Sequence, residues 1–295
     1  MFKRVAIITS DQDPAAQTIR KIFLANWRFT ETGEKFDGYP IFQCTDFQKL
    51  QDTTPSEIFL GTIKDRAIFC ERLDECCSAD LILIANQHRS ESGAPAFLTH
   101  CTGNWTDATE HGGFPRGLAR ASGRILQLAL RALFKRNLEA GLHFDVSLEV
   151  THHGPTANKV PLAFLELGST EREWPNETYA SVVAQAVMDV AQNVTANVQS
   201  QVYLGFGGPH YAPSFTRFAL ETTACTSHIV PKYFIQEIER DQIQQMIERT
   251  VEPVAGFLLD WKGLNAADRN KLLPLLNQFN IPVVRTDHLF KAVEK

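Results

Sequence analysis

The sequence lacks any Cys-x-x-Cys pair, although it contains six cysteines. This absence argues against a zinc site built from cysteines. Cys76 and Cys77 are neighbours, and a bond between them would constrain little of the chain, so we expect all six thiols to be reduced. No apolar run approaches the ~20 residues of a membrane-spanning helix, and the first apolar run is too short for a signal peptide. We therefore expect a soluble, cytoplasmic protein with no membrane partner.

Positive charge is also scarce in this sequence. Lys and Arg number 29 against 34 Asp and Glu, which gives a formal net charge of -5. A generic polyanion binder is usually basic overall, so any contact with nucleic acid has to come from a local basic patch. With 295 residues, of which 44% are hydrophobic and 21% charged, the composition is that of an ordinary globular protein with a buried core.

Short apolar runs end abruptly in polar or glycine-rich residues, a pattern typical of buried strands. These runs lie at 5–8, 81–85, 144–150, 202–206 and 257–259. Helical periodicity lies between them, at 14–26, 116–137, 176–193, 238–249 and 265–278. The alternation predicts an α/β fold with three αβα layers and a mixed, largely parallel sheet. Because ligands bind beyond the carboxyl ends of such strands, we expect the polar clusters to meet in one crevice.

The chain shows no clear boundary between domains, and we expect residues 1–295 to form a single domain. Thr30–Pro40 is rich in turn-forming residues and is interpreted as a loop. Residues 86–116 have little periodicity, and we predict that they form a long functional loop.

Histidine is concentrated in the polar clusters. Six of the nine histidines lie there: His88, His100, His152, His153, His210 and His228. Neutral imidazole is the commonest metal ligand in proteins and the usual general base near neutral pH. Several strand ends are therefore predicted to supply the three or so ligands of a catalytic zinc site. For any one histidine, the alternative is an ordinary surface or core position.

One segment carries the local basic charge that a nucleic-acid partner needs. Residues 116–136 contain six basic residues and no acidic one: Arg116, Arg120, Arg124, Arg131, Lys135 and Arg136. At 100° per residue, the first five occupy about a third of a helix circumference. This predicts an amphipathic helix with a basic outer stripe, which suits a phosphate backbone. The alternative is a solvated face that pairs with acids elsewhere in the chain.

Seven motifs occur in order along the chain. They are HRSESG (88–93), GNW (103–105), THHGPT (151–156), LELGSTEREW (165–174), GFGGPHYAP (205–213), SHIVPKY (227–233) and DWKGL (260–264). Together they resemble the archaeal and plant type of D-aminoacyl-tRNA deacylase, most strongly from about residue 81 to 265. One departure is Pro209, where this family is expected to have glycine. Because proline lacks an N–H, a backbone contact with an anion is not expected there.

The resemblance implies hydrolysis of the ester that joins a D-amino acid to tRNA. It also implies zinc as the cofactor and a fold related to those of phosphorylase and peptidyl-tRNA hydrolase. Activation of the attacking water by zinc or by a histidine base stays open. One alternative is a peptidyl-tRNA or small-amide hydrolase on a related scaffold, and another is a non-catalytic tRNA-binding protein. We expect tRNA charged with a D-amino acid as the partner, and a monomer or a homodimer as the assembly.

The site residues follow from the resemblance and from the clusters. The predicted catalytic residues are His152, His153, Thr156 and His210. The predicted zinc ligands are His88, His100, His153 and His210. The residues predicted to bind tRNA are Arg116, Arg120, Arg124, Arg131, Lys135, Lys232 and Lys262. Trp105 or Tyr211 is expected to stack on the terminal adenine.

Overall fold

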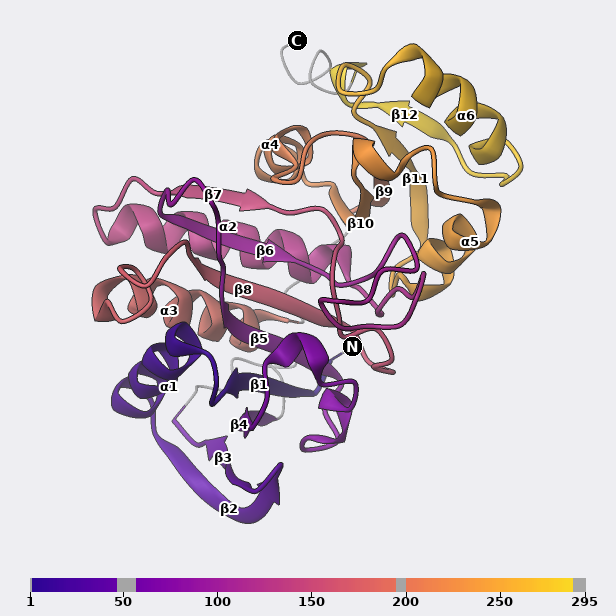
Figure 1. Cartoon of the computed structure of the whole chain (residues 1–295). Coiled ribbons are helices and arrows are strands. Elements are labelled where there is room, and N and C mark those ends of the chain that lie inside the picture. Colours follow the sequence, from indigo (N-terminus) through magenta and orange to yellow (C-terminus); the bar gives the residue numbers. More distant parts are fainter. Residues whose placement is uncertain (1, 47–56, 195–199, 289–295) are drawn as a thin grey trace.

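The computed structural model describes residues 2–46, 57–194 and 200–288, and these form two sheets and their helices (Figure 1). The larger sheet consists of β1 (Arg4–Ser10), β2 (Phe29–Phe36), β3 (Tyr39–Cys44), β4 (Glu57–Ile63), β5 (Leu81–Gln87), β6 (Ala96–His100), β7 (Asp145–Leu148) and β8 (Leu162–Gly168). The smaller sheet consists of β9 (Val202–Phe206), β10 (Cys225–Val230), β11 (Val254–Leu259) and β12 (Val283–Arg285). The helices are α1 (Pro14–Asn26), α2 (Gly123–Glu139), α3 (Glu177–Asn193), α4 (Pro213–Glu221), α5 (Arg240–Arg249) and α6 (Ala266–Leu276), and the 3₁₀ turns are η2 (Ala67–Phe69), η3 (Leu73–Glu75) and η4 (Lys232–Phe234).

The pairing of the strands confirms the predicted α/β fold with a mixed, largely parallel sheet. The order of the larger sheet is β2-β3-β4-β1-β5-β8-β6-β7, and that of the smaller is β10-β9-β11-β12. In the larger sheet, the pairs β1–β4, β1–β5, β5–β8 and β6–β7 are parallel, and the pairs β2–β3, β3–β4 and β6–β8 are antiparallel. All pairs of the smaller sheet are parallel.

The central strands of the larger sheet are buried on both faces, which explains their continuous apolar sequence. Successive side chains of a strand point to opposite faces. Ile7 and Leu83 pack in the core with α1, α2 and α3, which lie along one face of the sheet (Figure 1). Ile8 and Ile84 face the other way and pack against η2 and η3. Strands of this kind read as uninterrupted apolar runs because water meets neither face.

The smaller sheet is also covered on both faces. Tyr203 and Ile229 belong to the core that contains α2 and α4, whereas Leu204 and Phe257 pack with residues of α5 and α6. Helix α2 contacts strands of both sheets. We retain the prediction of a single domain because α2 joins the two sheets in one core. None of the helices in the described ranges is long and apolar enough to cross a membrane.

The predicted start of the basic helix is wrong. Residues 118–121 instead run in extended form, because their backbone groups bond to other segments: Ala119 N–H donates to Thr102 O and Ala121 N–H to Arg249 O. Helix α2 begins at Gly123, and the Ser122 hydroxyl caps it by accepting from Ile125 N–H at 3.2 Å.

The interpretation of Thr30–Pro40 as a loop is wrong as well. Strands β2 and β3 form an antiparallel hairpin there. Its two turn residues, Asp37 and Gly38, have φ of 52° and 88°, as a tight Asp-Gly hairpin turn requires. The predicted long loop 86–116 also contains a strand, β6, which pairs with both β7 and β8.

Candidate functional site

The segment that follows β7 links the two sheets and carries three residues of the site. Its backbone first bonds to the larger sheet, where Glu149 N–H donates to Thr99 O at 3.1 Å. The next two N–H groups, of Val150 and Thr151, donate at 3.0 Å to the carbonyl oxygens of His210 and Ile229, which follow or belong to strands of the smaller sheet. Glu149 and the doublet His152-His153 are thereby fixed at the junction of the two sheets.

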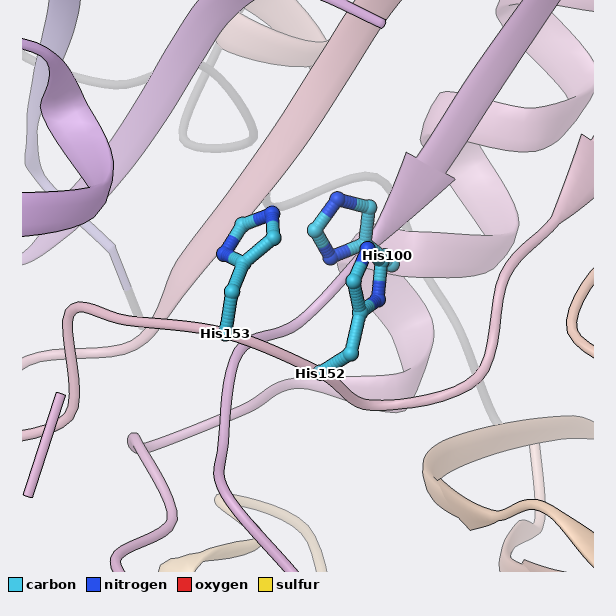
Figure 2. A group of neighbouring side chains, drawn as sticks. All are labelled: His100, His152 and His153. Atoms are coloured by element: carbon cyan, nitrogen blue, oxygen red, sulfur yellow. The ribbon is translucent and has the colours of Figure 1, made fainter. Parts of the chain in front are cut away.

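Four imidazole rings are in contact at this junction. His100, at the end of β6, lies 4.3 Å from His152 and 4.9 Å from His153 between ring centroids. Figure 2 shows these three side chains turned toward one another. The ring of His210 lies 4.7 Å from that of His152. The predicted convergence of histidines from distant parts of the chain is therefore observed.

Two buried carboxylates complete this cluster. Glu149 has a fully buried side chain, and its Oε1 lies 2.9 Å from His210 Nε2 and 3.6 Å from His88 Nδ1. Glu166, on β8, lies with its carboxylate 3.2 Å from His88 Nδ1 and 3.6 Å from His100 Nε2. Asn86 Nδ2 donates to Glu166 Oε1 at 2.9 Å and so holds this carboxylate in place. We call His88, His100, Glu149, His152, His153, Glu166 and His210 the histidine–carboxylate cluster.

Backbone carbonyls fix the tautomers of three histidines in the cluster. Nδ1 of His100, His152 and His153 lies 3.1, 2.8 and 2.6 Å from the carbonyl oxygens of Cys101, Val150 and Gly154. Each Nδ1 therefore carries the proton and donates it, which leaves the Nε2 lone pair free. Metal-binding histidines are held in this way, with the second nitrogen donating to a carbonyl or carboxylate.

The donor atoms fit a bound cation. His100 Nε2 and Glu149 Oε2 are buried without a hydrogen-bond partner, and the closest contact of Glu149 Oε1 is His210 Nε2 at 2.9 Å. Leaving such groups unpaired is costly, and a divalent cation is the partner that satisfies lone pairs and negative charge together. Three sets of ligand atoms lie within 4.8 Å of one another: His100–His152–His153, Glu149–His152–His210 and His88–Glu149–Glu166. Nitrogen and carboxylate donors in such sets are those that zinc prefers.

The electrostatics of the cluster separate its histidines into two kinds. Burial lowers the pKa values of His88 and His100, but the close contacts with the Glu166 carboxylate and the charge of Glu149 raise both above the usual histidine value. Burial and the neighbouring imidazoles lower the pKa of His152 well below that value and the pKa of His153 to about 3. Burial raises the pKa of Glu166, but its close contacts with the rings of His100 and His88 bring this pKa well below the usual range.

A cavity of about 430 Å³ opens onto the cluster. His88, His152, His153, Glu166 and His210 line its inner part. The rest of the lining comes from four segments of the chain: Arg66 and Ile68, Asn86 to Arg89, residues 103–111, and Phe234. A cavity of this size accommodates a small ligand or one end of a larger one.

Two of the predicted residues occupy other places. The Thr156 hydroxyl accepts from Phe114 N–H at 2.8 Å, so Thr156 supports the neighbouring loop and does not line the cavity. His228 lies fully buried in β10, where Cys101 Sγ is 3.4 Å from its Nδ1. Trp105 lines the cavity, but it is only 2% exposed and donates from Nε1 to Thr151 O. Of the two residues predicted to stack on the terminal adenine, Tyr211 is therefore the more accessible.

Most basic side chains of the predicted stripe bind other groups of the protein. The alternative, in which these residues pair within the chain, describes their contacts better. Arg116 and Arg120 precede α2, and Arg116 Nε lies 3.2 Å from Asp107. Arg124 and Arg131 donate to backbone carbonyl oxygens of Ser200, Ala219 and Thr222. On the last turns of α2, Lys135 lies 3.8 Å from Glu139, and Arg136 pairs with Asp189 and Glu139. Lys232 and Lys262 are exposed, and they follow the ends of β10 and β11.

The sequence interpretation missed Glu166 and Asn86 as site residues. Both carried a signal, because a charged or amide side chain inside a buried apolar strand is uncommon and needs a partner. Glu166 interrupts the run Leu162–Gly168, in which every residue is buried.

Pro209, the predicted departure from the family motif, contributes its carbonyl oxygen, which accepts from Ala212 N–H at 3.1 Å.

The buried His228 predicts acid sensitivity. Burial lowers its pKa to about 3, so the unfolded chain takes up this proton more readily than the folded protein. Neutral, buried His228 therefore stabilises the folded protein fully at pH values above about 6.5, the pKa of histidine in the unfolded chain. As the pH falls below this value, the free energy of unfolding decreases, by about 2 kcal/mol at pH 5. We expect His228→Gln to lose correspondingly less stability between pH 7.5 and pH 5 in urea unfolding. The control His143→Gln, at an exposed position, should keep the wild-type slope, and an unaltered slope in His228→Gln would contradict the assignment.

The fold and the cluster together define an α/β protein with a cavity that ends in nitrogen and carboxylate donors, the composition of catalytic zinc sites. A model of the family described as D-aminoacyl-tRNA deacylase matches residues 76–284. The chain belongs to this family, which confirms the resemblance of its motifs.

The relatives support this assignment over nearly the whole chain. A D-aminoacyl-tRNA deacylase of Thermococcus kodakarensis is 36% identical over 279 residues, which cover 95% of this chain and 98% of the relative. One of Methanosarcina acetivorans is 31% identical over 293 residues, which cover 97% of this chain and 93% of the relative. The crystal structure of a conserved protein of unknown function has a similar fold, with a TM-score of 0.83 at 27% identity, and covers 98% of this chain and 96% of that one.

Proposed function

We propose that this protein hydrolyses the ester between a D-amino acid and tRNA, and that the histidine–carboxylate cluster holds the zinc that assists the reaction. The observation that carries the proposal is the set of inward Nε2 atoms beside the buried Glu149 carboxylate, whose Oε2 has no hydrogen-bond partner, in a cluster that lines a cavity. Family membership supplies the substrate class.

His100, His152 and His153 are the first candidates for ligands, because backbone carbonyls already fix their tautomers. His210 and Glu149 stand beside them at 2.9 Å from one another. A bound zinc ion supplies a Lewis acid for the ester carbonyl and lowers the pKa of water toward ~7. With its lone pair directed into the cluster, His153 acts as a ligand in this proposal, in preference to a general base.

His88 has a different position from the other histidines. Its Nδ1 faces Glu166 at 3.2 Å, and its Nε2 lies 3.2 Å from the Tyr211 hydroxyl, which donates in turn to Ser90 Oγ at 3.1 Å. We propose that His88 orients Tyr211 beside the cluster and that His210, 3.2 Å from the Tyr233 hydroxyl, orients Tyr233 in the same way. In this proposal, both hydroxyls hold a proton near the ribose of a bound substrate.

The activity is tested with matched substrates. The purified protein should release tyrosine from D-Tyr-tRNA much faster than from L-Tyr-tRNA. Equal rates on the two would reject the D-specific reaction. A preference for N-acetylated aminoacyl-tRNA would instead favour a peptidyl-tRNA hydrolase, and salt-sensitive binding of tRNA without turnover would favour a non-catalytic binder.

Lys232 and Lys262 are proposed to hold phosphates of the tRNA. Both follow strands of the smaller sheet at its carboxyl edge, and Lys232 N–H donates to Gly208 O at 2.9 Å, two residues before His210. We expect the double variant Lys232→Ala/Lys262→Ala to weaken tRNA binding and to reduce the slope of log affinity against log salt by about 2, since each phosphate contact contributes about 1. Lys271→Ala, exposed on α6, is the control, and an unchanged slope in the double variant would count against both contacts.

The compartment of the reaction is inferred from the proposed substrate. We propose the cytoplasm as the site of action because charged tRNA is used there.

A further inference from the structure

Two phenylalanines are exposed on segments that are far apart in the sequence and that both contribute to the wall of the cavity. Phe69, in η2, is 49% exposed, and Phe114, in the loop between β6 and α2, is 55% exposed. Their neighbours Arg66, Ile68 and His111 line the cavity itself. The two rings are therefore carried by segments that form one wall of this cavity, and Phe69 itself lines a second hollow together with Asp65 and Arg72.

Close backbone packing fixes the segments that carry these rings. A Cβ on Gly112 would overlap the Ile68 carbonyl oxygen and would lie 3.3 Å from the Phe69 ring, and a Cβ on Gly154 would overlap the backbone of Gly113. Gly112 and Gly113 also have φ of 79° and 80°, which disfavours any other residue there. The positions of η2 and of the loop are thus set against each other without intervening side chains.

Side chains from two motifs form hydrogen bonds with the backbone of the same loop. Asn104, of the GNW motif, donates from Nδ2 to Gly112 O at 2.8 Å and to Phe114 O at 3.1 Å. Thr156, of the THHGPT motif, accepts from Phe114 N–H at 2.8 Å. Asn104 and Thr156 are both buried, so two buried polar side chains fix the backbone that carries the exposed Phe114 ring.

We infer that Phe69 and Phe114 form a stacking surface for an unpaired base at the 3′ end of the tRNA. The inference rests on the proposed function, which places the terminal ribose in the cavity and its base along the wall formed by η2 and the loop. Unpaired bases are recognised by stacking on aromatic rings and guanidinium planes, and this wall carries the two exposed rings and the Arg66 side chain. The same residues explain why Asn104 and Thr156 belong to motifs although neither is a ligand of the cluster.

A fluorescence titration tests the stacking without catalysis. The probe is uncharged single-stranded RNA ending in CCA, with 2-aminopurine in place of the terminal adenine. The wild-type protein should quench its fluorescence on binding. Phe69→Ala/Phe114→Ala should abolish the quenching, and Phe114→Trp should retain it. Phe134→Ala is the control, because Phe134 is 42% exposed on α2. Undiminished quenching by the double variant overturns the inference.

Steady-state kinetics give a second, independent readout. Loss of one base–aromatic stack should raise KM for D-Tyr-tRNA roughly 5- to 150-fold in Phe114→Ala, with a much smaller change in kcat. A loss confined to kcat, or conversion of a dimer to a monomer in light scattering, overturns the inference in favour of a structural or assembly role. If the wild type quenches the probe but releases no amino acid, the proposed function fails and the stacking surface stands.

Discussion

Replacing Glu149 with glutamine should lower kcat for D-Tyr-tRNA by about 100-fold or more and remove zinc from the purified protein. The substitution keeps the size of the side chain but removes its charge. Glu149 is fully buried, lies within 4 Å of His88, His100 and His210, and has no other hydrogen-bond partner for its carboxylate oxygens. A neutral amide there offers a weaker oxygen ligand and directs N–H donors toward a group of imidazole nitrogens.

The measurements for Glu149→Gln are metal content by mass spectrometry and single-turnover deacylation. Glu248→Gln, on the exposed side of α5, is the matched control and should keep both the metal and the rate. If Glu149→Gln retained full zinc and full activity, Glu149 would be a structural residue and the donor set would have to be reassigned.

Removing the metal with a chelator should abolish deacylation and lower the melting temperature by about 10 °C, since a ligand at about a thousand times its Kd stabilises by about 4 kcal/mol. The reason is the number of lone pairs in a small space: without a cation, those of the His100, His152 and His153 imidazoles face one another where the cluster lines the cavity. Added Zn²⁺ should restore both properties, whereas Mg²⁺ should not, because magnesium prefers oxygen ligands.

Calorimetry and the deacylation assay on the same samples check this prediction. A sample that loses all zinc and yet keeps its melting temperature and its rate would show that the cluster works without a metal. A sample that loses stability but keeps its rate would separate a structural ion from the reaction.

Local patterns predicted the elements whose sequence matches their surroundings. Helix α1 occupies Pro14–Asn26 as expected, and the runs 5–8, 81–85 and 202–206 lie in the buried strands β1, β5 and β9. Elements whose partners are distant were missed. Strand β2 is exposed along most of its length and has no apolar alternation, so only its pairing with β3 defines it. Strand β6 is fixed by its neighbours β7 and β8 in the same way.

The basic segment before and within α2 shows where reasoning from sequence fails in this chain. A helical projection places Arg116 and Arg124 on one stripe, but a projection holds only while the backbone is helical. Backbone hydrogen bonds from Ala119 and Ala121 to distant carbonyl oxygens keep the preceding segment extended. The guanidinium groups then bind protein oxygens, such as Ser200 O for Arg124, which no local pattern encodes.

By itself, the sequence determined the α/β class, the family and the candidate histidines, because local composition and short motifs encode each of these. Only the tertiary structure decided that Glu149 and Glu166 join those histidines, that Thr156 supports a loop, and that two exposed phenylalanines lie on segments of the cavity wall. The physical reason is that the junction is made by the segment after β7, whose backbone bonds first to one sheet and then to the other. Distances across such a junction depend on the packing of both sheets at once.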